Sequence, residues 1–196
     1  VIHCRQNVQK AVFESGVNTE TYRDVDIASF IPAMRFLVES NYFVIKVGGL
    51  EGCGFDDPLF FDAHRGRSDY DSWWDVAFAA AAYLFIGCGS GGYCLAAILG
   101  KQIISVSVLP LNYTLPHCVS GIGIPKKIFS ADGARMSLHE GLSLGYGGFC
   151  SDAEYMSHKL SLEDNSPEAI IEAIKLCLIE DYVPELLQPL NDLVVK

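Results

Sequence analysis

Short apolar runs alternate along the chain with segments in which apolar residues recur at helical spacing. Runs of strand length occupy residues 1–6, 42–49, 59–64, 84–88, 101–110 and 124–129. Helical patterns occupy residues 26–41, 68–84, 93–100, 133–144, 166–178 and 183–193, and residues 7–26 are polar enough to predict a loop. Strands that are apolar throughout and separated by helices predict a mostly parallel sheet covered on both faces. We therefore expect a Rossmann-like, doubly wound α/β fold.

Several helix ends carry local signals. Asp26 is placed to cap the first helix, and Ser68 or Asp69 is placed to cap the second. Gly100 follows an apolar helical segment as a C-cap, and Pro167 stands at the first position of a later helix. These signals support the assignment of helices between the predicted strands.

Length and composition favour one domain with a sizeable core. The chain has 196 residues, 50% of them hydrophobic, so residues 1–196 are expected to form a single domain. Trp73 and Trp74 are expected in that core rather than on a stacking platform. The net charge is −10 and no basic run is interleaved with aromatic residues, which disfavours nucleic acid and anionic membrane as partners. An anionic ligand would have to be held by a few arginines or by backbone amides.

The cysteines indicate a reducing compartment. There are seven, an odd number, with no C-x-x-C pair, and most lie in apolar runs. We expect reduced, buried thiols in a cytoplasmic protein, without a metal site. No uninterrupted apolar stretch reaches the roughly 18 residues needed to span a membrane.

The stretch "FIGCGSGG", residues 85–92, is the main candidate binding feature. A buried strand ends in glycines and a helix follows, which is the arrangement that presents backbone amides and a helix dipole to an anion. The spacing is neither G-x-G-x-x-G nor a Walker loop. A tight turn in which strand and helix pack closely is the alternative. The candidate ligand-binding residues of this glycine loop (residues 87–92) are Gly87, Gly89, Ser90, Gly91 and Gly92.

Arginines follow two of the predicted strands. Arg5 comes after the first strand, and Arg65 and Arg67 come after the third. Because ligands bind beyond the carboxyl ends of the strands in doubly wound sheets, these side chains are candidates for bidentate contacts to an anion. The alternative is a set of surface ion pairs with neighbours such as Asp62 or Asp71.

The remaining candidates are single residues. His64 is the better placed acid or base, and Asp69 is a second candidate that could equally serve as a helix cap. Asn112 lies in the loop after the strand at 101–110. Glu140 could hold ribose hydroxyls, although a surface role is the ordinary expectation for it. His3 is expected to be a core residue rather than a base.

Several blocks in the same order resemble a bacterial glycosyltransferase family with a GT-B-like fold. "YRDVDIASFIPAMRFLVESNYFVIKVG" is similar to its "YRNVDIENYIPAIKYL…GYYVIRMG" pattern, and "RSDYDSWWDVAFAAAAYLFIGCGSGG" to its "RSDFxDxxLxAxxxFFIGTxSG" block. "IPKKIFS" and "DNSPEAIIEAI" resemble two later blocks. The similarity extends from about residue 1 to residue 174.

The resemblance implies the carboxy-terminal, donor-binding half of a two-domain enzyme. Its donor would be a nucleotide-diphosphate sugar, its acceptor a glycan such as a surface polysaccharide, and it would need no metal or other cofactor. Arg5, within "HCR", matches a phosphate-contacting arginine. Arg67 and the loop around Ser90 would complete the diphosphate site, and Glu140 would hold the ribose. The acceptor site would lie in a separate N-terminal domain, so the resemblance implies that residues 1–196 are a fragment of a larger protein.

The sequence departs from the family pattern inside the glycine loop. Cys88 and Gly89 stand where the family has threonine and asparagine, so those side-chain contacts to phosphate are lost. Two alternatives stay open. One is a different transferase on the same scaffold, such as a polysaccharide pyruvyl transferase-like enzyme. The other is a non-catalytic nucleotide- or sugar-binding module.

Overall fold

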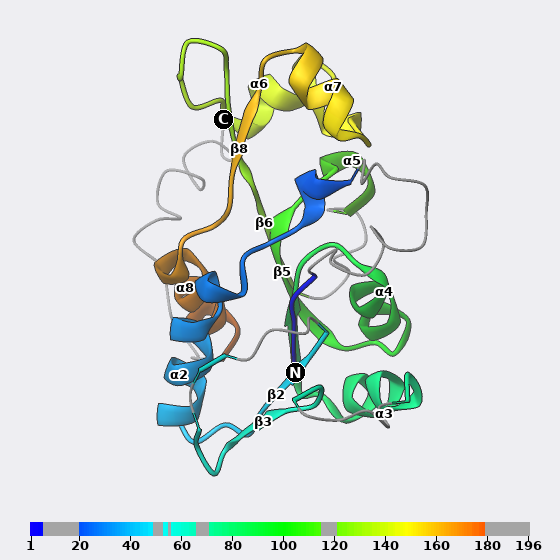
Figure 1. The fold of residues 1–196 in the computed structure, drawn as a ribbon, viewed down its shortest axis with the longest axis vertical. Helices are drawn as coiled ribbons and strands as arrows, with labels where there is room; N and C mark the ends of the chain where they lie inside the picture. The colour runs from blue at the N-terminus through cyan, green and yellow to red at the C-terminus, as the bar shows by residue number, and fades with distance from the viewer. Residues whose placement is uncertain (6–19, 49–52, 55, 66–70, 115–120, 179–196) are drawn as a thin grey trace.

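The centre of the molecule is a six-stranded parallel sheet (Figure 1). The computed structural model describes residues 1–5, 20–48, 53–54, 56–65, 71–114 and 121–178. The strands are β1 (Ile2–His3), β2 (Val44–Val47), β3 (Phe60–Asp62), β4 (Leu84–Gly87), β5 (Gln102–Val108) and β6 (Gly121–Pro125). All neighbouring pairs are parallel, in the order β3-β2-β1-β4-β5-β6. This confirms the predicted Rossmann-like α/β fold.

The strand order reverses direction between β1 and β4. From β1 the chain adds β2 and β3 on one side, and β4, β5 and β6 then extend the other side. β1 and β4 are themselves neighbours, with Ile2 opposite Ile86 and His3 opposite Gly87. Loops leaving two strands at such a switch point diverge, and the crevice between them is the usual ligand site of doubly wound sheets.

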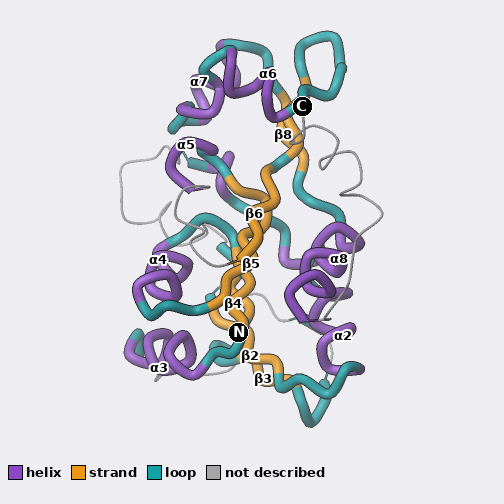
Figure 2. Tube along the Cα trace, turned by 180° about the vertical axis from the view of Figure 1, so that it is seen from behind, coloured by secondary structure: helices purple, strands orange, loops and turns teal. Residues whose placement is uncertain are grey.

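Helices cover both faces of the sheet (Figures 1 and 2). α2 (Ile31–Glu39) and α8 (Pro167–Leu178) pack against each other on one face, while α3 (Trp73–Ala81) and α4 (Gly91–Ile98) lie on the other. The larger core lies between the sheet and the α2–α8 pair. Its fully buried members include Phe30, Met34, Ile86, Ile104 and Ile170.

A smaller layer lies beyond β6, at the end of the molecule opposite β3 (Figure 1). It contains the antiparallel pair β7 (Lys127–Phe129) and β8 (Ser161–Glu163), with α5 (Leu111–Thr114), α6 (Leu138–Ser143), α7 (Asp152–Ser157) and the 3-10 turn η4 (Tyr146–Gly148). Tyr22, Leu109, Leu111, Ile128 and Tyr155 form its own apolar cluster. Tyr22 belongs to the 3-10 turn η1 (Thr21–Arg23), so this cluster also holds η1.

Two predicted elements near the second layer are corrected. The single strand expected at 124–129 is divided at Lys126, whose buried ammonium binds the Asp24 carbonyl and the Asp164 carboxylate. The helix expected at 133–144 is only α6, because residues before it turn back along β7, where Met136 N–H donates to the Ile128 carbonyl. β8, α5 and α7 were not predicted, since each is short and weakly patterned.

The helix predicted at 26–41 is divided in two. Asp26 accepts from the Ala28 amide and caps a 3-10 turn, η2 (Ile27–Ser29), and α2 begins only afterwards, with a proline in its first turn. A 3-10 turn is a common way for a helix to begin.

The helix predicted at 68–84 begins at Trp73, whose backbone N–H donates to the Asp71 carboxylate. The expected capping residues Ser68 and Asp69 lie outside the described residues. Trp73 and Trp74 are 72% and 45% exposed, and the expectation that they are core residues is wrong, because α3 turns Ala79 inward instead. The helix predicted at 183–193 also lies outside the described part.

The expectation of buried thiols holds for part of the set. Cys4, Cys53 and Cys88 are buried, whereas Cys94 and Cys150 are exposed. Cys94 lies on α4 and Cys150 in the turn before α7, where no described element covers them, and Cys118 lies outside the described residues.

Candidate functional site

The candidate site lies where β1 and β4 end side by side. His3 is the last residue of β1 and Gly87 the last of β4, and the two are register partners. Cys4 and Arg5 follow β1, and the glycine loop follows β4 and leads into α4 at Gly91. The structure thereby brings Arg5 and the glycine loop, which are about 85 residues apart in the chain, to the same point of the sheet.

Three glycines make room for the His3 side chain and backbone. A Cβ at Gly48 would lie 2.8 Å from His3 Nε2, a Cβ at Gly92 would lie 3.0 Å from His3 Cδ2, and a Cβ at Gly87 would lie 2.9 Å from the His3 carbonyl oxygen. By contrast, a Cβ at Gly91 would meet no atom within 4 Å. Close packing therefore explains Gly87 and Gly92, whereas Gly91 faces open space at the start of α4.

Ser90 precedes α4 but does not cap it. It occupies the N-cap position with extended backbone and makes no side-chain cap hydrogen bond, while its hydroxyl lies 3.1 Å from Nδ1 of His3. Burial lowers the pKa of His3 to about 4, with Asp75 opposing the shift, so the ring is neutral at pH 7. The first amides of α4 are thus not taken by the serine, and the helix dipole points at the space before Gly91.

Cys88 joins the two loops of the site. Its sulfur accepts a hydrogen bond from the Arg5 amide at 3.0 Å, and burial raises its pKa to about 11, which keeps the thiol neutral. Cys4 makes a similar contact, since its thiol donates to the Val25 carbonyl at 3.2 Å. Cys88 therefore has a structural use in holding the glycine loop against the end of β1.

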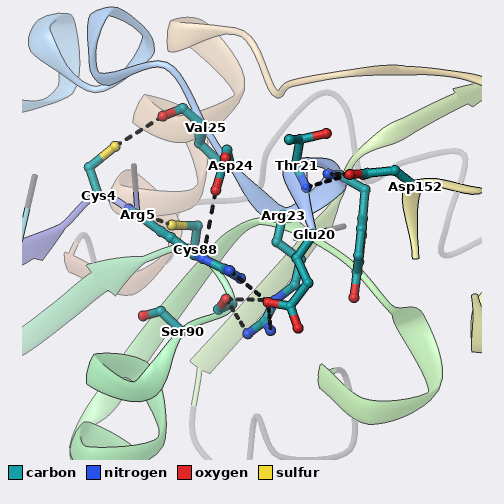
Figure 3. A network of polar contacts seen from close by, with 12 residues as sticks. Cys4, Arg5, Glu20, Thr21, Arg23, Asp24, Val25, Cys88, Ser90 and Asp152 are labelled. Carbon is teal, nitrogen blue, oxygen red and sulfur yellow. Dashed lines mark hydrogen bonds and ion pairs between the residues drawn. The ribbon is translucent and has the colours of Figure 1, made fainter. Parts of the chain in front are cut away.

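Two arginines meet beside the glycine loop (Figure 3). Arg5 donates through Nη2 to Oε2 of Glu20 at 2.7 Å, and its Nε lies 3.6 Å from Oδ1 of Asp24. Arg23 donates to the same Glu20 oxygen at 3.3 Å and, through Nε and Nη2, to the carbonyl of Gly89 at 3.2 and 2.7 Å. The ion pairs expected as the alternative for Arg5 are therefore present, with partners other than those considered.

Arg23 was missed by the sequence reasoning. It lies in a polar segment without periodicity, and its main contact is with a loop residue 66 positions away. Its segment is held by Asp152 at the start of α7, which accepts from the amides of Thr21 and Tyr22 at 2.9 and 2.7 Å.

Asp24, the second acidic partner of Arg5, is partly buried. Burial raises the pKa of its carboxyl group, and the charges of Arg5 and Lys126 partly oppose that rise.

Of the candidates that follow β3, the structure describes His64 and Arg65. His64 is half-buried and donates its backbone N–H to Asp62. Arg65 is exposed and paired with Asp56 at 2.6 Å. Arg67 and Asp69 lie outside the described residues.

The two candidates from later in the chain belong to the second layer. Asn112 lies against η4, where its amide oxygen would be 2.7 Å from a Cβ at Gly147. Glu140 forms a capping box with Ser137, and these hydrogen bonds lower the pKa of its carboxyl group. In the structure Glu140 therefore has a local capping role, and no contact joins it to the glycine loop.

The fold and site define a doubly wound α/β protein with an arginine-flanked glycine loop at its switch point. Comparisons with known proteins do not narrow this class: no family model, no curated protein and no solved structure matches the chain. Among the described helices, none has the length and apolar character needed to cross a membrane. Within the same residues, no three histidine, cysteine or acidic side chains are grouped as metal ligands.

Proposed function

We propose that this chain is the donor-binding part of a glycosyltransferase and that the glycine loop takes the diphosphate of a nucleotide sugar. The observation that carries the proposal is the arrangement at the switch point. There the N-terminus of α4, which the Ser90 side chain does not cap, and Arg5, whose backbone N–H donates to Cys88 Sγ, lie at the same glycine loop. The family resemblance of the sequence supports the same ligand class.

The chemistry follows from where charge develops during sugar transfer. When the bond from the anomeric carbon to the donor phosphate breaks, negative charge grows on the departing nucleoside diphosphate. Backbone amides at Gly91 and Gly92, together with Arg5, would stabilise that charge without a metal ion. His64 or Asp69 would move the acceptor proton, and Arg67 would add charge to the diphosphate site. The glycan acceptor would be bound with the help of an N-terminal domain.

A panel of UDP-, GDP-, ADP- and CMP-sugars in a thermal-shift assay tests the proposal. A ligand at about 100 times its Kd stabilises the folded state by about 2.7 kcal/mol, which raises the Tm by several degrees. We expect at least one nucleotide sugar to do so. A wild-type chain that responds to none of them contradicts the donor site.

Gly91 is a suitable position for a substitution because a Cβ there would meet no atom within 4 Å. Gly91→Glu places a carboxylate in the first turn of α4, where it suits the helix dipole but repels a diphosphate. We expect this variant to fold with an unchanged or higher Tm and to lose the ligand response, while Gly91→Gln keeps part of it. Equal responses in both variants would place the ligand elsewhere.

A second experiment separates transfer from binding alone. If a nucleotide sugar binds but is neither transferred nor hydrolysed, the non-catalytic binding module is the better description. Transfer of a pyruvyl group instead of a sugar would favour the pyruvyl transferase-like alternative.

A further inference from the structure

One carboxylate oxygen of Glu20 accepts hydrogen bonds from both arginines of the site. Oε2 accepts from Arg5 Nη2 at 2.7 Å and from Arg23 Nη1 at 3.3 Å (Figure 3). The two arginines come from separate segments, one after β1 and one in η1. Two guanidinium groups that converge on one oxygen form an arrangement suited to phosphate as well as to carboxylate.

This oxygen is held next to the glycine loop. Nε and Nη2 of Arg23 donate to the carbonyl of Gly89, which lies one residue before Ser90 and two before the start of α4. Arg5 is tied to the same loop through Cys88. The Glu20 carboxylate therefore lies beside the position where the helix amides would bind an anion.

The guanidinium of Arg5 has a donor nitrogen that no described residue binds. Its Nη1 is buried and makes no hydrogen bond with any described residue. Its side chain is 12% exposed, whereas that of Glu20 is 34% exposed. The carboxylate is thus more accessible to solvent than the guanidinium, as a group that a ligand displaces must be. Asp24, at 3.6 Å from Nε, would still hold Arg5 in place.

We propose that the position of the Glu20 carboxylate is an anion subsite, and that an oxygen of the ligand's phosphate replaces Glu20 when the ligand binds. Glu20 neutralises Arg5 and Arg23 in the empty site and competes with the ligand for them. The identity of that ligand as a nucleotide diphosphate rests on the proposed function. The subsite itself requires only a phosphate anion.

The competition predicts an affinity that is lower than the site could provide. A protein whose binding-competent form is only partly populated shows a Kd raised by the inverse of that fraction. Removing the charge of Glu20 while keeping its shape should therefore tighten binding. A purely structural ion pair predicts the opposite, because its loss would loosen Arg5 and Arg23.

Calorimetric titration with inorganic pyrophosphate distinguishes a Glu20 that competes with the ligand from a Glu20 that forms a purely structural ion pair. We expect Glu20→Gln to bind pyrophosphate about tenfold more tightly than the wild type. Glu163→Gln is the matched control, since Glu163 pairs with Lys127 in the second layer, and we expect its affinity to equal that of the wild type. Unchanged or weaker binding in Glu20→Gln would overturn the proposal.

A second readout does not depend on affinity. Phenylglyoxal modifies accessible arginines, and peptide mass mapping reports the rate at each position. We expect Arg5 and Arg23 to react several times faster in Glu20→Gln, and pyrophosphate to suppress that reaction in both proteins. Equal rates in the two proteins would contradict the exchange of Glu20 for the ligand.

The outcomes separate the subsite from the donor site. If pyrophosphate binds and Glu20→Gln strengthens it while no nucleotide sugar binds, the subsite stands and the proposed function fails. If nucleotide sugars bind in a manner that depends on Gly91, and Glu20→Gln changes neither affinity nor arginine reactivity, the proposed function stands and the subsite fails.

Discussion

Ser90 directs its hydroxyl to Nδ1 of His3, 3.1 Å away, and not to the amides of the helix that it precedes. This contact ties the start of α4 to the end of β1. It also leaves the first amides of α4 to another partner. By holding the Ser90 hydroxyl, His3 both packs the two strand ends together and keeps the first amides of α4 available to an anion.

We expect His3 to make stability depend on pH. Burial lowers its pKa from 6.5 in the unfolded chain to about 4 in the folded protein. Between these values the unfolded state binds more protons, so the free energy of unfolding falls as the pH drops from about 6.5 towards 4. The full difference corresponds to roughly 3 kcal/mol. Above pH 6.5 His3 contributes no pH dependence.

The measurement is urea unfolding of the wild type and of His3→Asn between pH 4 and 8. Asparagine can still meet the Ser90 hydroxyl but does not titrate in this range. We expect a flatter pH dependence in the variant. Parallel curves for the two proteins would show that His3 is not the group responsible.

Two adjacent glycines should respond oppositely to alanine. Gly92→Ala brings a Cβ to 3.0 Å from the His3 ring and should destabilise the protein by about 1–3 kcal/mol. Gly91→Ala meets open space, so it should be neutral or stabilise α4 by up to about 1 kcal/mol. Chemical denaturation of both variants, and of Gly92→Ala combined with His3→Ala, checks this. Additive effects in the double variant would exclude the contact as the cause.

The buried ion pair between β2 and β3 should be costly to break. Lys46 Nζ lies 3.2 Å from both oxygens of Asp62, and the two side chains are 1% and 4% exposed. Lys46→Met leaves a buried carboxylate without its counter-ion and should cost about 3–5 kcal/mol. Adding Asp62→Asn should recover much of that loss. Denaturant unfolding gives both values.

The control for the buried Lys46–Asp62 pair is the more exposed ion pair between Lys127 and Glu163. Lys127→Met breaks an ion pair in which Glu163 is 56% exposed, and surface pairs contribute about 0–1 kcal/mol. A loss of similar size in Lys46→Met and Lys127→Met would show that burial of Lys46 does not set the cost.

Arg5 should be required for binding, and a distant arginine should not. Arg5→Gln removes the charge beside the glycine loop, and we expect it to abolish the nucleotide-sugar thermal shift. Arg135→Gln changes an exposed arginine of the second layer and should leave the shift intact. Because Arg5→Gln also breaks ion pairs with Glu20 and Asp24, circular dichroism should verify its fold. A folded Arg5→Gln with wild-type binding contradicts the assignment.

The periodicity of the sequence was enough to predict the sheet and most of its helices. The apolar runs around Ile45, Ile86 and Ile104 became strands of one parallel sheet, as their apolar pattern predicted. Short elements were lost because two or three residues carry little periodicity. Gly121 and Gly123 interrupt the apolar pattern of β6, so the predicted strand began only at residue 124. β8 has only three residues and was not separated from a loop.

The candidate site was predicted less completely than the fold. Arg5 and the glycine loop were found because each follows a strand, and strand ends meet at one edge of a parallel sheet. Arg23 and Glu20 could not be found, since their importance comes from contacts with Arg5 and Gly89 across the fold. Trp73 was assigned to the core on hydrophobicity alone, but the side on which α3 packs decides its exposure.

The sequence by itself determined the α/β class, the glycines at the end of β4 and the arginine after β1, because each depends on local pattern and composition. Only the tertiary structure decided that Gly92 makes room for His3 while Gly91 does not, and that Glu20 lies between Arg5 and Arg23. The physical reason is that strand order and packing set the distances between groups far apart in the chain, and no local pattern carries that information.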